Sequence, residues 1–329
     1  MTLAAIFGLS GPTLTPAEHA FFAEAKPWGF ILFARNIDTP DQVRGLVSDL
    51  RVAVGRDAPV LIDQEGGRVA RLRPPHWRDW PAPLAEAEAD EERLALRYRL
   101  IAAELMALGI DVNCAPMLDL PQADTHPIIA DRVLGRDPST IARRGRTVAN
   151  ALVDGGVLPI IKHIPGHGRA ATDSHEVLPV VVTPEAELVE TDFAPFRALA
   201  DLPMAMTGHV VFSEIDPERP ATLSPTVIDR IRGEIGFDGL LMTDDLSMRA
   251  LSGPMAGRVR EALAAGCDLV LHCNGSFDEM DAVAAEAPAL SGRAAMRAEA
   301  ALARRRPPTA ADLEALAAQY RQLTGERAA

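Results

Sequence analysis

The chain has 329 residues, a length that suits either one large α/β barrel or two ordinary domains. Hydrophobic residues make up 48% of the chain, which is enough to fill a substantial core and excludes an intrinsically disordered protein. The formal net charge of −13 argues against a nucleic-acid-binding protein and against binding to anionic membranes.

The amino-terminal segment does not have the pattern of a secretory signal. Residues 1–10 contain no basic residue and only a short apolar stretch. No apolar run reaches the ~18 residues that a membrane span needs. The chain has three cysteines, Cys114, Cys267 and Cys273, and this small, odd number argues against a disulfide framework. We therefore expect a cytoplasmic protein with reduced thiols.

Short apolar runs recur along the chain, and turn residues and then a stretch of helical period follow each run. The runs are continuously apolar, a pattern typical of parallel strands that are buried on both faces. Eight strands are predicted: Ala4–Gly8, Gly29–Phe33, Pro59–Ile62, Asp111–Ala115, Leu158–Lys162, Met204–Thr207, Gly239–Thr243 and Asp268–His272. Eight strand–helix units in about 270 residues predict an α/β fold of the (β/α)8 TIM barrel type. A doubly wound open sheet is the alternative, because a sequence cannot prove closure.

Helix starts are well marked between the predicted strands. The segments Thr15–Glu18 and Thr39–Gln42 have the pattern of a capping box with proline at the first helical position. Similar starts are predicted at Thr183-Pro184 and Ser224-Pro225. The clearest helix is predicted over Glu92–Leu108, where apolar residues recur on one side.

The carboxyl-terminal part departs from the strand–helix alternation. The run Arg304–Arg306, followed by two prolines, ends a helix, and a further helix is predicted over Asp312–Leu323. We interpret the arginine run as a solvated helix end rather than a nucleic-acid patch. The domain prediction is a single catalytic barrel over residues 1–290 with a helical extension over residues 291–329 that packs on it.

Charged and polar side chains gather where the predicted strands end. In a TIM barrel these ends form one face of the molecule, and the active site lies there. A buried charge carries a desolvation cost unless it meets a partner or a ligand, so this convergence predicts a polar pocket that suits a sugar. The side chains are Asp63, Glu65 and Arg68 after the third strand, Asp119 after the fourth, Lys162 and His163 at the fifth, His209 after the sixth, Asp244 and Asp245 after the seventh, and His272 and Asn274 at the eighth.

The segment 162–175 contains three histidines. His163 and His167 have the i, i+4 spacing of a zinc-binding helix, but Pro165 and Gly166 lie between them and argue against a helix there. We therefore predict a long, shaped loop and no metal site.

Two residues near the end of this loop, Asp173 and His175, can act as a pair. In extended backbone they lie on the same side, where the carboxylate can hold the imidazole and raise the pKa of His175 above about 6.5. Such a histidine can be an acid in one step and a base in the next. An Asp-x-His pair alone is more often a surface hydrogen bond, but its place at a barrel mouth favours catalysis. Because glycines flank it, we expect the Gly166–Ser174 loop to move during the cycle.

Two carboxylates follow the seventh predicted strand. Asp244, at the strand end, should point into the pocket, where a carboxylate can attack an anomeric carbon or stabilise an oxocarbenium-like charge. Asp245 is expected to cap the next helix.

These segments resemble the β-N-acetylhexosaminidases of glycoside hydrolase family 3. The family pattern Lys-His-(Phe)-Pro-Gly-His-Gly, followed by Asp-Ser-His, matches residues 162–175, with Ile164 at the usually aromatic position. The family's nucleophile pattern matches Thr243–Met248. Further matches lie at residues 63–69, 113–119, 131–135 and 220–224, with Val133 in place of the expected residue, so the resemblance covers roughly residues 4–275.

The resemblance implies the roles of particular residues. Asp244 would form a covalent glycosyl-enzyme, and His175, supported by Asp173, would be the acid/base. Four further residues would hold the hydroxyl groups of N-acetylglucosamine: Asp63, Arg132, Lys162 and His163.

The resemblance also implies a substrate and a location. The short bacterial members resemble a cytoplasmic enzyme that releases terminal N-acetylglucosamine from peptidoglycan fragments (1,6-anhydro-muropeptides) during cell-wall recycling. We accordingly expect a retaining β-N-acetylglucosaminidase that works as a monomer on small carbohydrates, without a metal or cofactor and without nucleic-acid or membrane partners.

Two other functions remain open at this point. Lys162 at a strand end suits a Schiff-base aldolase, although the charges beside it are not the desolvating apolar pocket that such a lysine needs. A non-catalytic sugar-binding barrel is the other alternative, and the presence of Asp173, His175 and Asp244 together argues against it.

Overall fold

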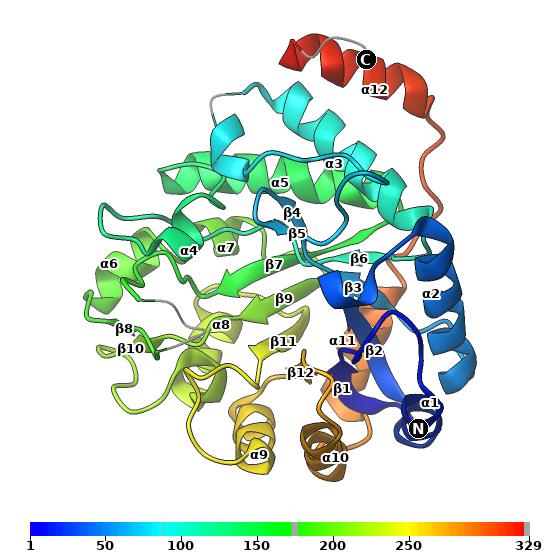
Figure 1. The fold of residues 1–329 in the computed structure, drawn as a ribbon. Coiled ribbons are helices and arrows are strands. Elements are labelled where there is room, and N and C mark those ends of the chain that lie inside the picture. Colours follow the sequence, from blue (N-terminus) through cyan, green and yellow to red (C-terminus); the bar gives the residue numbers. More distant parts are fainter. Residues whose placement is uncertain (88, 173–176, 326–329) are drawn as a thin grey trace.

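Eight parallel strands close into a barrel in the computed structural model, which describes residues 1–87, 89–172 and 177–325 (Figure 1). These strands are β1 (Leu3–Phe7), β2 (Pro27–Leu32), β3 (Val60–Ile62), β6 (Val112–Asn113), β7 (Leu158–Ile164), β9 (Met204–Thr207), β11 (Leu240–Asp245) and β12 (Leu269–His272). Each strand begins and ends within two residues of its predicted bounds. Around the barrel the order is β1-β12-β11-β9-β7-β6-β3-β2, and β1 pairs with both β12 and β2. The predicted TIM barrel is confirmed, and the open-sheet alternative is wrong.

Alternation along each strand divides the core into an inner and an outer part. In β1, Ala4 and Ile6 belong to a buried cluster made of strand residues from around the barrel. Their neighbours Ala5 and Phe7 belong to a second buried cluster, which includes residues of the surrounding helices. Because both faces of every strand are buried, the strands are continuously apolar in sequence.

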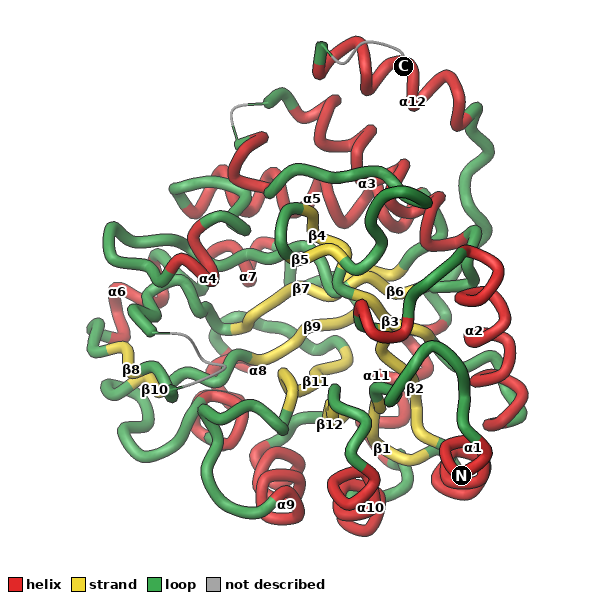
Figure 2. The backbone as a smooth tube through the Cα atoms, viewed as in Figure 1, coloured by secondary structure: helices red, strands yellow, loops and turns green. Residues whose placement is uncertain are grey.

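Helices surround the barrel, and α3 confirms the helix predicted over Glu92–Leu108 (Figure 1). The helices are α1 (Pro16–Ala25), α2 (Pro40–Val54), α3 (Glu91–Met106), α4 (Pro127–Ala130), α5 (Pro138–Asp154), α6 (Glu185–Glu190), α7 (Ala194–Ala198), α8 (Pro225–Gly233), α9 (Met255–Ala265) and α10 (Phe277–Glu286), with short 3-10 turns at Ala34–Asn36, Pro83–Glu86 and Ala221–Leu223. Two small sheets lie in the loops: β4 (Gln64–Gly66) with β5 (Val69–Ala70), and β8 (Val180–Val181) with β10 (Val211–Phe212), the latter at the left of Figure 2.

The predicted capping box at the start of α1 is present. The Thr15 hydroxyl accepts from the Glu18 N–H at 3.2 Å, and the Glu18 carboxylate accepts from the Thr15 N–H at 2.9 Å. At α2 the box is incomplete. Thr39 accepts from the Gln42 N–H at 3.3 Å, but the Gln42 side chain accepts from the Asp38 N–H instead.

The two later helix starts differ from each other. Ser224 caps α8 as predicted, by accepting from the Val227 N–H at 3.1 Å. The predicted cap at Thr183 is wrong, since α6 begins after Pro184 without a side-chain cap. The Thr183 hydroxyl accepts from Arg169 at 3.3 Å instead.

Two helices follow α10 in the carboxyl-terminal part. α11 (Gly292–Leu302) contributes Ala298 and Ala301 to the inner cluster of the barrel. α12 (Leu313–Thr324) packs on α3, at the top of Figure 1. The domain boundary at residue 290 stays a prediction. None of the helices among the described residues is both long enough and apolar enough to cross a bilayer.

Candidate active site

A cavity of about 440 Å³ lies at the carboxyl ends of the barrel strands. This volume is within the range of small-ligand pockets, and the location is the one at which TIM-barrel enzymes carry their active sites. Residues from β7, β11 and the loops after β3 and β6 face this one space. Five of the predicted site residues line it: Asp63, Arg132, Lys162, His163 and Asp244.

A network of buried charges forms one side of the cavity. The Lys162 ammonium donates to Asp63 at 2.8 Å and lies 2.6 Å from Glu65. Arg132 donates two hydrogen bonds to the Glu65 carboxylate, from Nε at 2.9 Å and from Nη2 at 2.8 Å. Arg71 donates to the other oxygen of Asp63 at 3.0 Å. The cations and carboxylates therefore hold one another in fixed positions, a geometry that suits recognition of a hydroxyl-rich ligand.

Mutual pairing keeps this network ionised. Burial alone would lower the pKa of Lys162, but Asp63 and Glu65 raise it above its usual range. Burial would raise the pKa of Glu65, but Arg132 and Lys162 lower it to about 2. Lys162 is therefore an ammonium group that can donate hydrogen bonds. A Schiff-base lysine needs a free amine, so this pairing disfavours the aldolase alternative.

The histidines at the end of β7 are arranged around Asp119. His163 Nδ1 lies 2.7 Å from one oxygen of Asp119, and the His167 N–H donates to the other oxygen at 2.7 Å. Burial would raise the pKa of Asp119, but His163 lowers it to about 2. Burial and the nearby His163 lower the pKa of His167 to about 4, so its ring is neutral at pH 7. Among the described residues, no group of three or more His, Cys, Asp or Glu side chains could hold a metal ion.

The two carboxylates of β11 have different surroundings. Asp244 lines the cavity, and its Oδ1 accepts from the Asp245 N–H at 2.8 Å. The Asp245 carboxylate accepts from the N–H groups of Ser247 and Cys273, at 3.0 and 3.1 Å. The prediction that Asp245 caps a helix is wrong, because a turn follows β11 and the next helix begins only at Met255.

Two histidines at strand ends are structural in this arrangement. His209 is buried, with Nδ1 2.8 Å from the Thr222 hydroxyl and Nε2 3.0 Å from the Asp245 carbonyl oxygen. His272 was predicted to join the polar pocket, but its Nε2 lies 3.0 Å from Glu279 of α10 and it does not line the cavity. Both ring nitrogens of His209 therefore have partners within the protein, as buried polar groups usually do, whereas His272 is held through Nε2 alone.

The loop after β7 is anchored where it leaves the barrel. Gly168 packs so closely on the backbone of the preceding loop that an added Cβ would lie 1.9 Å from a carbonyl oxygen. Arg169 pairs with the buried Asp192 at 2.7 Å. A glycine is therefore required at position 168 for this close packing. The movement predicted for the Gly166–Ser174 loop stays a prediction. The proposed acid/base residues Asp173 and His175 lie outside the described residues.

The cavity-lining residues that were not selected from the sequence include one aromatic residue, Phe33, and two arginines, Arg35 and Arg71. Phe33 directly follows β2, and Arg71 follows the β4–β5 hairpin. The available signal was their position: Phe33 ends the second predicted strand, Arg35 follows that strand, and Arg71 lies in the loop after the third, on the face where the charged residues gather.

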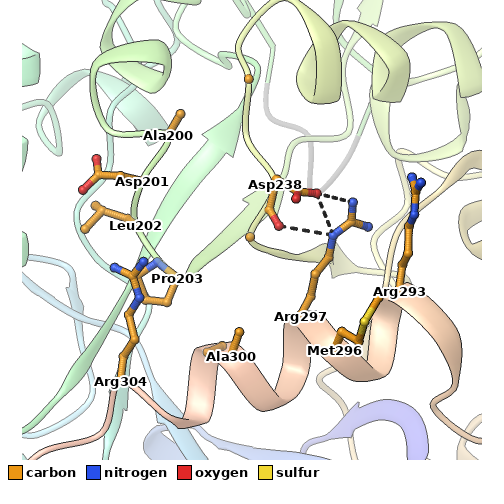
Figure 3. Close-up of a pocket in the computed structure, with 13 residues that line it drawn as sticks. Ala200, Asp201, Leu202, Pro203, Asp238, Arg293, Met296, Arg297, Ala300 and Arg304 are labelled. Atoms are coloured by element: carbon orange, nitrogen blue, oxygen red, sulfur yellow. Dashed lines mark hydrogen bonds and ion pairs between the residues drawn. The ribbon is translucent and has the colours of Figure 1, made fainter.

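A second cavity, of about 640 Å³, lies at the amino-terminal ends of β9 and β11, against α11 (Figure 3). Figure 3 shows the guanidinium of Arg297 hydrogen-bonded to Asp238. The same guanidinium donates to the buried Asp268 at 3.0 Å. Conserved chemistry in TIM barrels is found at the other end, and these ion pairs join α11 to the barrel.

The chain matches one protein family and several of its relatives. The model of the glycosyl hydrolase family 3 N-terminal domain matches residues 17–305. A β-hexosaminidase of Methylococcus capsulatus is 39% identical over 277 residues, which cover 82% of each chain. A β-hexosaminidase of Alkalilimnicola ehrlichii is 38% identical over 281 residues, 82% of this chain and 80% of the relative.

Solved structures agree with the family. NagZ from Neisseria gonorrhoeae has a TM-score of 0.85 at 28% identity, and the match covers 99% of this chain and 96% of that one. The same protein has been crystallised with N-trifluoroacetyl-D-glucosamine. A β-N-acetylglucosaminidase from Paenibacillus sp. has a TM-score of 0.82 at 30% identity, over 99% of this chain and 62% of that one. The chain therefore belongs to glycoside hydrolase family 3 and is a β-hexosaminidase on a single TIM barrel.

Proposed function

We propose that this β-hexosaminidase is a retaining β-N-acetylglucosaminidase whose nucleophile is Asp244. The observation that carries the proposal is the position of Asp244 at the carboxyl end of β11, in the cavity that Asp63 and Lys162 also line. The Asp245 N–H orients the carboxylate by donating to its Oδ1. A carboxylate so placed can attack the anomeric carbon of a bound sugar.

In the proposed reaction, His175 is the acid in the first step and the base in the second, and the Asp173 carboxylate holds its imidazole. In the first step Asp244 forms a bond to the anomeric carbon while the His175 imidazolium protonates the departing glycosidic oxygen. In the second step the neutral imidazole takes a proton from water, the water oxygen attacks the anomeric carbon, and the bond to Asp244 breaks. A histidine with a pKa near the working pH can serve in both steps.

The buried charge network is proposed to hold the sugar. Lys162 and Arg132 supply N–H donors, Asp63 supplies carboxylate oxygens and His163 supplies a ring nitrogen, all at the cavity wall. Their ion pairs fix them before the ligand arrives, which lowers the entropic cost of binding. The complex of the Neisseria protein with N-trifluoroacetyl-D-glucosamine supports an amino sugar as the ligand.

The proposed natural substrates are peptidoglycan fragments, the 1,6-anhydro-muropeptides, from which the enzyme releases terminal N-acetylglucosamine in the cytoplasm. We propose that it acts as a monomer without a metal or cofactor. The support is the family resemblance, together with a cavity whose polar lining suits a carbohydrate.

Replacement of Asp244 is the direct test. Asp244→Ala should lower turnover of 4-nitrophenyl N-acetyl-β-glucosaminide by more than about 10³-fold, because no nucleophile remains. The matched control is Asp229→Asn, at an exposed position on α8, which should retain activity. NMR of the first product should show the β-anomer. Release of the α-anomer first would contradict the covalent mechanism.

Substrates with different leaving groups test His175. In His175→Ala, glycosides of acidic phenols should lose little in the first step, because such phenols leave without protonation. The second step should then be slow, so the glycosyl-Asp244 adduct should accumulate and be detectable by mass spectrometry. Equal losses for good and poor leaving groups would remove His175 from the acid role.

Two further assays address the alternatives. A Schiff-base enzyme would be trapped covalently at Lys162 by borohydride in the presence of a carbonyl substrate. A sugar-binding protein would bind N-acetylglucosamine tightly in calorimetry without turnover of any aryl glycoside. The proposed function predicts neither result.

A further inference from the structure

Four arginines of the described chain line the active-site cavity, and Arg35 differs from the other three in its partners. The other three donate to carboxylates: Arg68 to Asp131, Arg71 to Asp63 and Arg132 to Glu65. Within the described residues, Arg35 makes no ion pair. It is a guanidinium at the wall of the cavity whose charge no contacting carboxylate neutralises.

Backbone carbonyl groups hold Arg35 in place. Its Nε donates to the Leu9 carbonyl oxygen at 2.6 Å, and its Nη2 donates to the Cys273 carbonyl oxygen. The guanidinium carbon lies 5.0 Å from the centre of the Phe33 ring, in a cation–π contact. Arginine has five N–H donors, and these two bonds leave three of them for another acceptor.

The segment that carries Arg35 is fixed to its surroundings. The buried Asn36 side chain donates to the carbonyl oxygens of Leu9 and Gly11, at 3.2 and 2.8 Å. Its own carbonyl oxygen accepts from the Phe33 N–H at 2.9 Å. Arg35 is therefore ordered before a ligand arrives, and little conformational entropy is lost when it binds one.

Arg35 lies on the outer side of the site. It is exposed, whereas Arg71, which lies over the same Phe33 ring at 5.2 Å, is half-buried and pairs with Asp63. The proposed sugar position is the inner part of the cavity, among the buried charges and Asp244. The group attached to the sugar must leave the cavity toward its exposed rim, where Arg35 and Phe33 lie.

We propose that Arg35, with the Phe33 ring beneath it, binds a carboxylate carried by the leaving group, so that the preferred substrates are N-acetylglucosaminides of acidic aglycones. This inference rests on the proposed glycosidase function. An arginine with free N–H groups binds a carboxylate through paired, charge-assisted hydrogen bonds. Asp245 attracts Arg35 electrostatically, but its carboxylate is held by the N–H groups of Ser247 and Cys273.

Two substrates that differ by one negative charge on the leaving group test the proposal. The two are nitrophenyl N-acetyl-β-glucosaminides with either a carboxylate or a carboxamide on the ring, compared by kcat/KM at equal phenol acidity. The wild-type enzyme should prefer the carboxylate by about tenfold, and 1 M salt should reduce that preference. Arg35→Gln should bring the ratio close to one. Arg260→Gln, which removes an exposed charge on α9 outside the cavity, should keep the wild-type ratio.

The outcomes separate this inference from the proposed function. If neither glycoside is hydrolysed, the glycosidase proposal fails. If both are hydrolysed but the wild-type enzyme shows no preference, or Arg35→Gln retains it, the role of Arg35 is overturned. Because Arg35 also binds two backbone carbonyls, circular dichroism should check the fold of the variant. Should it not fold, the wild-type ratio and its salt dependence decide the question.

Discussion

The charged side chains of the cavity illustrate how single residues are kept ionised in a buried site. A buried carboxylate or ammonium is costly to remove from water, and the cost is offset only by good pairing geometry. Glu65 meets this condition, since Lys162 and both donors of Arg132 surround it within 2.9 Å. The network therefore contributes to stability only while all of its members carry their charges.

The first prediction concerns Glu65 and acid unfolding. Its pKa is 4.5 when unperturbed and about 2 in the folded protein, because Arg132 and Lys162 outweigh the effect of burial. The lowered pKa means that its stabilisation is present above about pH 4.5 and is lost as the pH falls toward 2. Glu65→Gln should lower the free energy of unfolding at pH 7 by roughly 3 kcal/mol.

Urea unfolding of both proteins at pH 7, 4.5 and 3 measures this effect. The wild-type protein should lose more stability between pH 4.5 and 3 than Glu65→Gln does. The control Glu214→Gln, at an exposed position, should follow the wild-type pH dependence. Parallel curves for wild type and Glu65→Gln would show that the network does not lower the pKa of Glu65.

At the scale of elements, the carboxyl-terminal helix supports the active site through α3. The Tyr320 hydroxyl of α12 donates to the buried Glu86 at 2.9 Å. Glu86 also pairs with Arg97 of α3, and Arg97 donates to the Glu65 carbonyl oxygen at 2.6 Å. The Tyr320 ring packs edge-on against Trp80, with ring centres 5.4 Å apart. α12 therefore stabilises the β4 backbone from which Glu65 enters the charge network.

The second prediction tests this connection. Tyr320→Phe keeps the ring contact but removes one donor from a buried carboxylate, so it should lower the free energy of unfolding by about 1–3 kcal/mol. Gln319→Ala on the same helix removes a hydrogen bond to the exposed Glu92 and should cost less than about 0.5 kcal/mol. Chemical denaturation measures both. Equal effects would mean that the Tyr320 hydroxyl contributes no more than a surface group.

Sequence predicted the elements better than their contacts. The eight barrel strands and α3 were found because continuous apolar runs and apolar residues at helical spacing are local patterns. The role of Asp245 was wrong, since its partner Cys273 lies 28 residues away and no local pattern reports that contact. The pairing of Glu65 with Arg132 spans 67 residues and was missed for the same reason. The pocket itself was predictable, because strand ends in a barrel must meet.

At the scale of the whole molecule, closure of the barrel depends on its first and last strands. β1 is hydrogen-bonded to β12 and to β2, so the beginning of the chain completes the ring. The apolar strand pattern is the same in a closed barrel and in an open sheet. Closure was therefore predicted from the number of strand–helix units, and the strand pattern alone could not prove it. The two ends of the closed barrel differ. The carboxyl ends of the strands surround the charged cavity, and α11 packs at the amino-terminal ends.

The final prediction concerns this division. Arg297 joins α11 to the barrel through Asp238 (Figure 3) and through Asp268. Arg232 remains to pair with Asp268 at 2.8 Å if Arg297 is lost. Arg297→Met should therefore lower the free energy of unfolding by about 1–3 kcal/mol. Because the active-site cavity lies at the opposite end of the barrel, the kcat/KM of Arg297→Met at 25 °C should stay within twofold of the wild-type value.

Lys162→Met is the contrasting variant, since it removes a donor from the cavity wall and should lower kcat/KM by 10-fold or more, at about 1.4 kcal/mol per factor of ten. Thermal unfolding and aryl-glycoside kinetics on the same samples compare the two. A loss of activity in folded Arg297→Met would show that the two ends of the barrel are coupled, because Arg297 touches no residue of the active-site cavity in the described chain.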